Sequence, residues 1–80
     1  MTQREKLLNR ARENPNGLRF DDFETLLAQC DWALDRQSGS HRLWHSPQGY
    51  RLPIQEGRNG KAKQYQVEQF LHQYSLEKGV

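Results

Sequence analysis

The chain has 80 residues, with one cysteine, three histidines and a formal net charge of +2 at pH 7. This length predicts a single domain, near the lower limit of what a hydrophobic core stabilises without staples. A single cysteine excludes an internal disulfide bond, and no Cys/His spacing matches a zinc site, so we expect neither a metal nor another cofactor. The start is polar and charged and no apolar run approaches ~18 residues, which argues against a signal peptide or membrane span and favours the cytoplasm.

The charge is unevenly distributed along the chain. Residues 36–63 carry six basic side chains against one acidic side chain, a net charge of +5, whereas the remainder carries six bases and nine acids, a net charge of −3. A basic middle between acidic flanks is typical of a protein that binds an anionic partner such as RNA. Six bases are also compatible with an ordinary solvated surface, and charge alone leaves both interpretations open.

The first predicted helix covers residues 3–12. Leu7, Leu8 and Ala11 recur at helical spacing among good helix formers, and the Asn-Pro-Asn-Gly stretch at residues 14–17 ends the helix. Its apolar stripe is narrow, which predicts a helix that docks loosely or against another molecule.

A second predicted helix begins near Phe20. Asp21 is placed to cap it, and Glu24 to complete a capping box. The apolar residues that follow occur at i, i+3, i+4 and i+7 and therefore predict one buried face. These residues are Phe23, Leu26, Leu27 and Cys30. We interpret Cys30 as a small core residue.

Three short segments with alternating side chains follow, at residues 32–37, 42–45 and 50–55. Ser-Gly-Ser at residues 38–40 and Pro-Gln-Gly at 47–49 predict the turns between them. This pattern is typical of an antiparallel meander with one apolar face, and Pro53 places the third strand at an edge. If Leu43 points inward with Leu34 and Leu52, Arg42 and Trp44 point outward. The direction of His41, at a strand end, stays open.

A basic loop leads to a final helix that begins near Lys63. Val67, Phe70, Leu71 and Tyr74 form its apolar face, and His72 lies on the exposed side. Lys61 and Lys63 near its N-terminus indicate either an anion site with free backbone N–H groups or a mild electrostatic misfit on a solvated surface.

The order of helix, helix, three strands and helix predicts an α+β fold. In this two-layer domain the helices cover a three-stranded antiparallel sheet. We treat residues 1–80 as a single domain, with residues 1–13 as an accessory helix and residues 18–76 as the core.

Three separate stretches carry a family resemblance. The first is Gly-Ser-His at residues 39–41, preceded by Arg-Gln at 36–37 and followed by a short apolar segment and Pro47. The second is Asn-Pro-Asn at residues 14–16 with Leu-Arg-Phe-Asp-Asp at 18–22, and the third is Gly-Lys-Ala-Lys-Gln-Tyr-Gln-Val at 60–67. In order and spacing they resemble the HicA family of bacterial toxins, over roughly residues 14–74.

The resemblance implies a fold like that of double-stranded-RNA-binding domains and an mRNA-cleaving endoribonuclease that works without a metal. It also implies a HicB-like antitoxin that covers the face carrying the catalytic histidine. That histidine corresponds to His41, with Gly39 and Ser40 intact. A second histidine often follows it in the family, whereas this chain has Arg42, so a mechanism that needs two adjacent histidines is in doubt.

The residues support this chemistry independently. Cleavage of RNA without a metal needs a base for the 2′-hydroxyl, a positive charge on the phosphate and an acid for the leaving oxygen. His41 fits the first or last role because the unperturbed pKa of histidine lies near working pH, and His45 is a possible second acid/base group. Trp44, if outward, would stack on an unpaired base. The predicted RNA-binding residues are Arg36, Ser40, Arg42, Trp44, Lys61 and Lys63.

Two other functions stay open. One is a module of similar fold that binds structured RNA without cleaving it, mostly through phosphates and therefore in a salt-dependent manner. The other is an inactive relative that acts only in protein–protein interaction.

Overall fold

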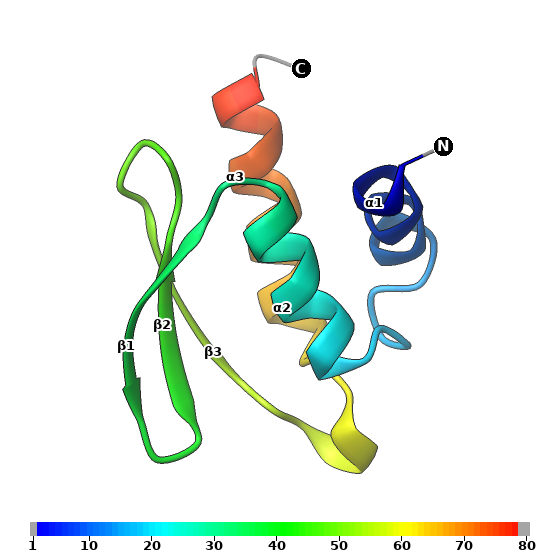
Figure 1. Cartoon of the computed structure of the whole chain (residues 1–80). Helices are drawn as coiled ribbons and strands as arrows, with labels where there is room; N and C mark the ends of the chain where they lie inside the picture. Colours follow the sequence, from blue (N-terminus) through cyan, green and yellow to red (C-terminus); the bar gives the residue numbers. More distant parts are fainter. Residues whose placement is uncertain (1, 79–80) are drawn as a thin grey trace.

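The computed structural model describes residues 2–78 and has an α+β fold, as predicted. In chain order the elements are α1 (Gln3–Glu13), α2 (Phe20–Gln29), β1 (Ala33–Ser38), β2 (His41–His45), β3 (Arg51–Gln55), the 3-10 turn η1 (Arg58–Gly60) and α3 (Gln64–Lys78). The sheet is antiparallel with the order β1-β2-β3, so β3 and its Pro53 lie at an edge, as expected. Figure 1 shows α2 and α3 on one side of the sheet, and α1 on the far side of these two helices. None of the helices in the described part is long and apolar enough to cross a membrane.

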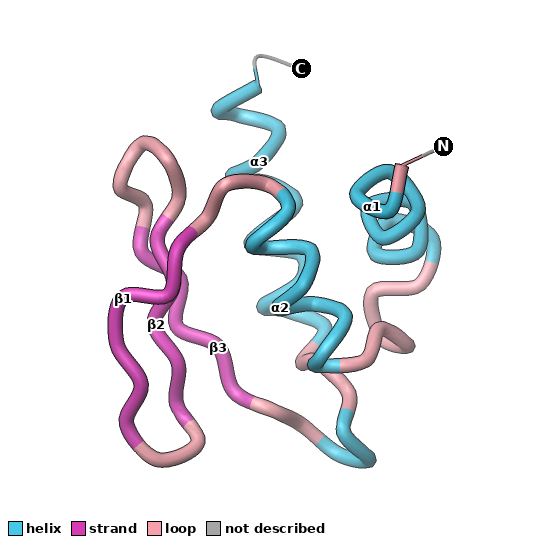
Figure 2. Tube along the Cα trace, viewed as in Figure 1, coloured by secondary structure: helices cyan, strands magenta, loops and turns pink. Residues whose placement is uncertain are grey.

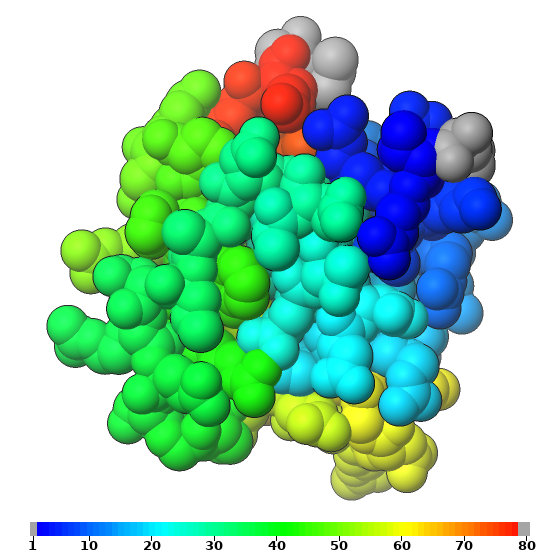
Figure 3. Space-filling model, viewed as in Figure 1, coloured from blue at the N-terminus to red at the C-terminus, as the bar shows by residue number. Residues whose placement is uncertain are grey.

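Helix α1 is firmly packed, contrary to the expectation of loose docking. Its apolar stripe of Leu7, Leu8 and Ala11 is buried against α2 and α3. Thr2 caps the helix, because its Oγ1 accepts a hydrogen bond from the N–H of Glu5 at 3.2 Å. The stripe is narrow, but packing against the two other helices leaves each of its side chains at most 5% exposed. In the space-filling view the N-terminal segment lies directly against the α2 region (Figure 3).

The predicted capping box of α2 is wrong. The helix begins one residue before Asp21, with Arg19 as N-cap and no side-chain cap hydrogen bond. Asp21 therefore lies in the first turn, where Thr25 Oγ1 donates to its carbonyl oxygen. Glu24 does not reach back to the N-cap, because its carboxylate accepts hydrogen bonds from Arg42 and Trp44 of β2.

The core lies between α2, α3 and the inner face of the sheet. The predicted buried face of α2 is confirmed, and Phe70 of α3 lies at the centre of an aromatic group. Its ring contacts Phe23, Trp32 and Tyr74 at centroid distances of 5.9, 5.2 and 5.8 Å. Cys30 is buried as expected, and burial raises the pKa of its thiol to about 11, so the thiol stays protonated at neutral pH.

The expectation that Trp44 and Arg42 point outward is wrong. Trp44 is 7% exposed and lies opposite Leu52 in the register, on the inner face, whereas Leu34 is 45% exposed. Burying the Trp44 indole removes more apolar area from water than burying Leu43, its neighbour on β2, which favours Trp44 as the inward residue. An irregularity in the pairing between Leu34 and Arg36 also interrupts the alternation in β1. Figure 2 shows β1 bent at its middle.

Candidate active site

His41 is the first residue of β2 and is exposed on the outer face of the sheet, away from the helices. The tight turn before it depends on Gly39, whose φ of 60° is strained for a residue with a side chain. Ser38 and His41 are paired across this turn, so the backbone of the imidazole-bearing residue is held by the sheet. The turn therefore presents a titratable ring to solvent from a well-defined backbone position.

Gln55 connects this turn to the basic loop. It is the cross-strand partner of His41 on β3, so their side chains share the outer face. Its Nε2 donates a hydrogen bond to Ser40 Oγ at 3.2 Å, and its Oε1 accepts one from Lys63 Nζ at 3.4 Å. The ammonium group of Lys63 is thus linked, through one neutral amide, to the residue before His41.

The position of Gln55 is itself fixed from α3. Its backbone N–H donates to Oε1 of Gln66, a buried polar side chain, at 3.0 Å. Polar groups buried in this way are costly unless paired, so this hydrogen bond favours one arrangement of the β3 end and the start of α3. Figure 1 shows the β1–β2 turn and the η1 turn at the same end of the molecule.

The basic loop is fixed by one backbone hydrogen bond to the body of the protein and one within the loop. Ala62 N–H donates to the Leu18 carbonyl, and Gly57 N–H to the Lys61 carbonyl, both at 2.8 Å. Lys61 and Lys63 line a hollow of about 430 Å³ beside the start of α3. In the described part of the chain neither lysine forms a salt bridge with a carboxylate. Both charges are therefore available to an anionic ligand.

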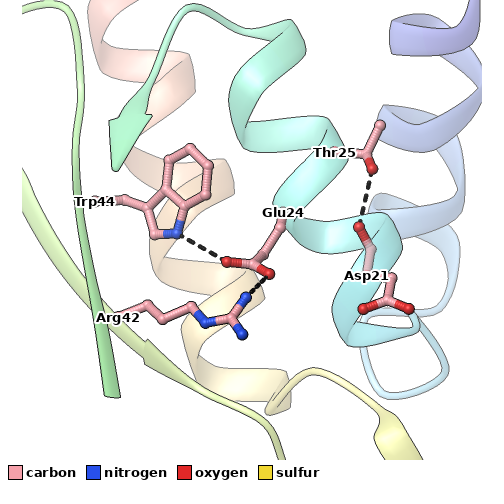
Figure 4. Close-up of polar contacts among 5 residues, drawn as sticks. All are labelled: Asp21, Glu24, Thr25, Arg42 and Trp44. Carbon is pink, nitrogen blue, oxygen red and sulfur yellow. Dashed lines mark hydrogen bonds and ion pairs between the residues drawn. The ribbon is translucent and has the colours of Figure 1, made fainter. Parts of the chain in front are cut away.

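Arg42 and Trp44 point towards α2 instead, with Trp44 buried and the Arg42 side chain 33% exposed. Glu24 of α2 accepts a hydrogen bond from Arg42 Nη1 through Oε1 and one from Trp44 Nε1 through Oε2, the latter at 3.3 Å (Figure 4). The Arg42 guanidinium also lies 5.3 Å from the centre of the Phe20 ring. Its charge is compensated inside the protein, and the Trp44 indole has no free face for a base. The outward direction that the predicted RNA contacts of Arg42 and Trp44 assumed is therefore not the one observed.

The remaining predicted residues lie elsewhere on the outer face. Arg36 is exposed and lies opposite Leu43, and His45 lies opposite Arg51 at the other end of β2. His45 lies four positions after His41 along β2, which corresponds to roughly 14 Å. That distance is too long for both imidazoles to act on one phosphodiester.

Sequence reasoning missed Gln55, Gln66 and Glu24. The turn lengths together with the alternation of β3 could have paired Gln55 with His41, because strand register follows from the turn between the strands. The reach of Lys63 to Gln55, and of Glu24 to Arg42, depends on how the helices lie on the sheet. No local sequence signal carries that information.

The side chains linked around His41 are a hydroxyl, an amide and an ammonium group. In the described residues no group of three or more His, Cys, Asp or Glu side chains is placed to hold a metal ion. The set suits acid–base chemistry on a phosphate ester, with one titratable ring and one fixed cation.

Comparisons with known proteins point to a single family. Curated proteins and solved structures gave no match, so the likeness to double-stranded-RNA-binding domains stays a prediction from the sequence. The family model described as "HicA toxin of bacterial toxin-antitoxin" matches residues 20–76, from the start of α2 to two residues before the end of α3. Because this match covers well over half of the chain, the protein belongs to the HicA toxin family and is a toxin of a bacterial toxin–antitoxin system.

Proposed function

We propose that this HicA toxin is an endoribonuclease that cleaves mRNA with His41 as its catalytic residue and without a metal. The observation that carries the proposal is the hydrogen-bonded chain from Ser40 through Gln55 to Lys63, beside an exposed imidazole. It links the positive charge of Lys63 to the turn that carries His41, the proposed proton acceptor, although the two residues are far apart in the sequence.

In this mechanism His41 takes the proton of the 2′-hydroxyl, which then attacks the adjacent phosphorus. Negative charge builds on the phosphate oxygens as the new bond forms, and the Lys63 ammonium stabilises it. Gln55 acts as a positioning residue, because it holds Lys63 on one side and the Gly-Ser-His turn on the other. The leaving 5′-oxygen takes a proton from solvent or from the protonated imidazole.

We further propose that the outer face of the sheet is covered by a HicB-like antitoxin in the resting cell. Arg36 and Arg51 are exposed on it together with His41, and the two guanidinium groups give an anionic partner surface cations to pair with. Residues 18–76 form the functional core of this single domain in our proposal. Helix α1 contributes stability to that core through its buried side chains.

The test compares His41→Ala with His72→Ala. His72 is exposed on α3 and serves as a matched histidine control. We expect His41→Ala to lower mRNA cleavage by about 100-fold or more with an unchanged circular dichroism spectrum, whereas His72→Ala cleaves like the wild type. Chelation with EDTA should leave cleavage intact. Full cleavage by His41→Ala would overturn the assignment.

A non-catalytic RNA-binding module is the second candidate, favoured by the uncompensated charges of Lys61 and Lys63. It predicts intact RNA after long incubation with folded wild-type protein, together with a salt-sensitive gel shift. The presence of a short neighbouring gene for a HicB-like protein would favour the toxin over this module.

A further inference from the structure

The hollow beside Lys63 has features that the cleavage chemistry does not use. It lies between η1 and the first turn of α3 and has a volume of about 430 Å³, within the range of about 300–1,000 Å³ that small-ligand pockets occupy. Its lining includes the cations Arg58, Lys61 and Lys63, the amide of Asn16 and the ring of Tyr65. Glu56 is the acidic residue next to this loop, so the local charge is clearly positive.

Tyr65 is unusual because it is a large aromatic side chain left in water. It is 58% exposed, whereas the other aromatic residues of α3 pack on the core. Exposure of an aromatic ring forgoes burial energy. The ring also lies in a hollow with three cations, which is the combination of stacking surface and positive groove that single-stranded nucleic acid binds.

The position of Tyr65 is coupled to the active site. Gln66 Nε2 donates to the Tyr65 hydroxyl at 3.3 Å, while its Oε1 accepts from the backbone N–H of Gln55 at 3.0 Å. Gln55 in turn holds Lys63 and Ser40. One amide network therefore sets the tyrosine, the lysine and the histidine turn relative to each other.

We propose that this hollow is a subsite for a nucleotide that flanks the cleaved bond in single-stranded RNA. Arg58 and Lys61 bind its phosphate, and the Tyr65 ring stacks on its base. Lys63 lies at the boundary, since it both lines the hollow and belongs to the chain of hydrogen bonds that leads to Ser40, the residue before His41. This inference rests on the proposed function in taking RNA as the ligand, and it replaces the buried Trp44 as the stacking residue.

The ring distinguishes RNA from an acidic protein partner. A protein carboxylate would use the three cations but would gain little from an exposed tyrosine, whereas an unpaired base gains from both groups. A paired base inside a duplex has no free face, so the ring contributes only when the RNA is single-stranded.

Binding is measured in the His41→Ala background, so that the RNA stays intact. The probe is a fluorescein-labelled single-stranded 12-nucleotide RNA, followed by anisotropy, with the matching duplex as the second probe. We expect Tyr65→Ala to raise the Kd for the single strand by about tenfold, and to leave the Kd for the duplex unchanged. Tyr65→Phe, which keeps the ring, should bind within about twofold of the parent. Leu76→Ala, an equally exposed side chain on the same helix, is the matched control and should have no effect.

The charges are tested by salt dependence. Lys61→Gln should lower the slope of log Kd against log salt concentration by about one unit, because one phosphate contact is lost, and Arg12→Gln on the exposed side of α1 should not change it. In the active protein, Tyr65→Ala should raise KM about tenfold with kcat within twofold of the wild type.

An unchanged Kd for the single strand in Tyr65→Ala would overturn the subsite, as would an equal loss for single strand and duplex. If Tyr65→Ala weakened the binding of an acidic protein partner and left RNA binding intact, the hollow would be a protein contact. That result would also overturn the RNA subsite. Because binding is measured without cleavage, these outcomes are separate from the His41 test. If the folded wild type cleaves no RNA but its RNA binding depends on Tyr65, the proposed endoribonuclease activity is overturned and the subsite is retained.

Discussion

The two faces of β2 use neighbouring residues for opposite purposes. On the inner face, Arg42 and Trp44 share one carboxylate of α2, and their polar groups are satisfied within the protein. On the outer face, His41 is exposed opposite Gln55, and the neutral amide of Gln55 accepts a hydrogen bond from Lys63. The cation next to the histidine in sequence therefore stabilises the fold. Lys63, from a distant loop, keeps its charge for a ligand because its hydrogen-bond partner Gln55 is neutral.

The largest expected effect comes from the inner face. Trp44→Ala should lower the free energy of unfolding by about 3–5 kcal/mol, because it removes a buried aromatic ring and leaves a cavity. Urea denaturation followed by circular dichroism measures this change. Leu34→Ala is the matched control across the strand pair and should cost less than about 1 kcal/mol, since Leu34 is 45% exposed. Equal costs for the two variants would contradict the burial of Trp44.

Removal of the shared carboxylate should have a smaller effect on the same face. Glu24→Gln leaves the half-buried Arg42 charge without a counter-charge and should cost about 2 kcal/mol in unfolding free energy. The Asp22→Asn variant breaks the more exposed salt bridge to Arg10 and should cost at most about 0.5 kcal/mol. Cleavage per folded molecule should stay unchanged in both variants. A loss of cleavage in fully folded Glu24→Gln would mean that the inner face takes part in the reaction.

On the outer face the expected effect is kinetic. Lys63→Gln should lower kcat for RNA cleavage about tenfold, equivalent to roughly 1.4 kcal/mol of transition-state stabilisation. Its unfolding free energy should change by no more than about 0.5 kcal/mol, because the lysine is held by a single long hydrogen bond at 3.4 Å. Lys78→Gln, at the other end of α3, controls for net charge. If Lys63→Gln lost stability but kept its cleavage rate, the proposed difference between the two faces would be wrong.

The smallest expected effect is a change in stability at acid pH, and it concerns the hydrogen bonds between Glu77 and the β2–β3 turn. Burial alone would raise the pKa of Glu77, but hydrogen bonds from Ser46, Gln73 and the backbone N–H of Gln48 outweigh it and hold the pKa below its usual value. A lowered pKa in the folded state contributes stability above the unfolded value of 4.5, and this contribution is lost as pH falls below 4.5. Glu77→Gln should therefore be less stable than the wild type at pH 7, with the difference shrinking towards pH 3. A difference that is independent of pH would rule out the carboxylate as the cause.

Much of the fold follows from local patterns in the chain. The helical spacing in residues 3–12 and 20–30, the alternation around Pro53 and the glycine turns specify the elements and their order, because each pattern depends on neighbours within a few residues. The position of His41 at the mouth of a tight turn was predictable for the same reason. The burial of Leu52 and Ile54 followed from period two alone.

Which side of β2 faces the helices was not decided locally. Its residues include apolar side chains on both faces, and the choice depends on two residues of another element, since Glu24 bonds to Arg42 and Trp44 and the Phe20 ring contacts Arg42. The same holds for the link from Ser40 to Lys63, which exists only because α3 presents its first turn to the edge of β3. Local sequence specifies periodicity, whereas the partner of each polar group depends on packing between elements that lie far apart in the chain. Because of that packing, Arg42 pairs with Glu24 and stabilises the fold, whereas Lys63 keeps its charge for a ligand.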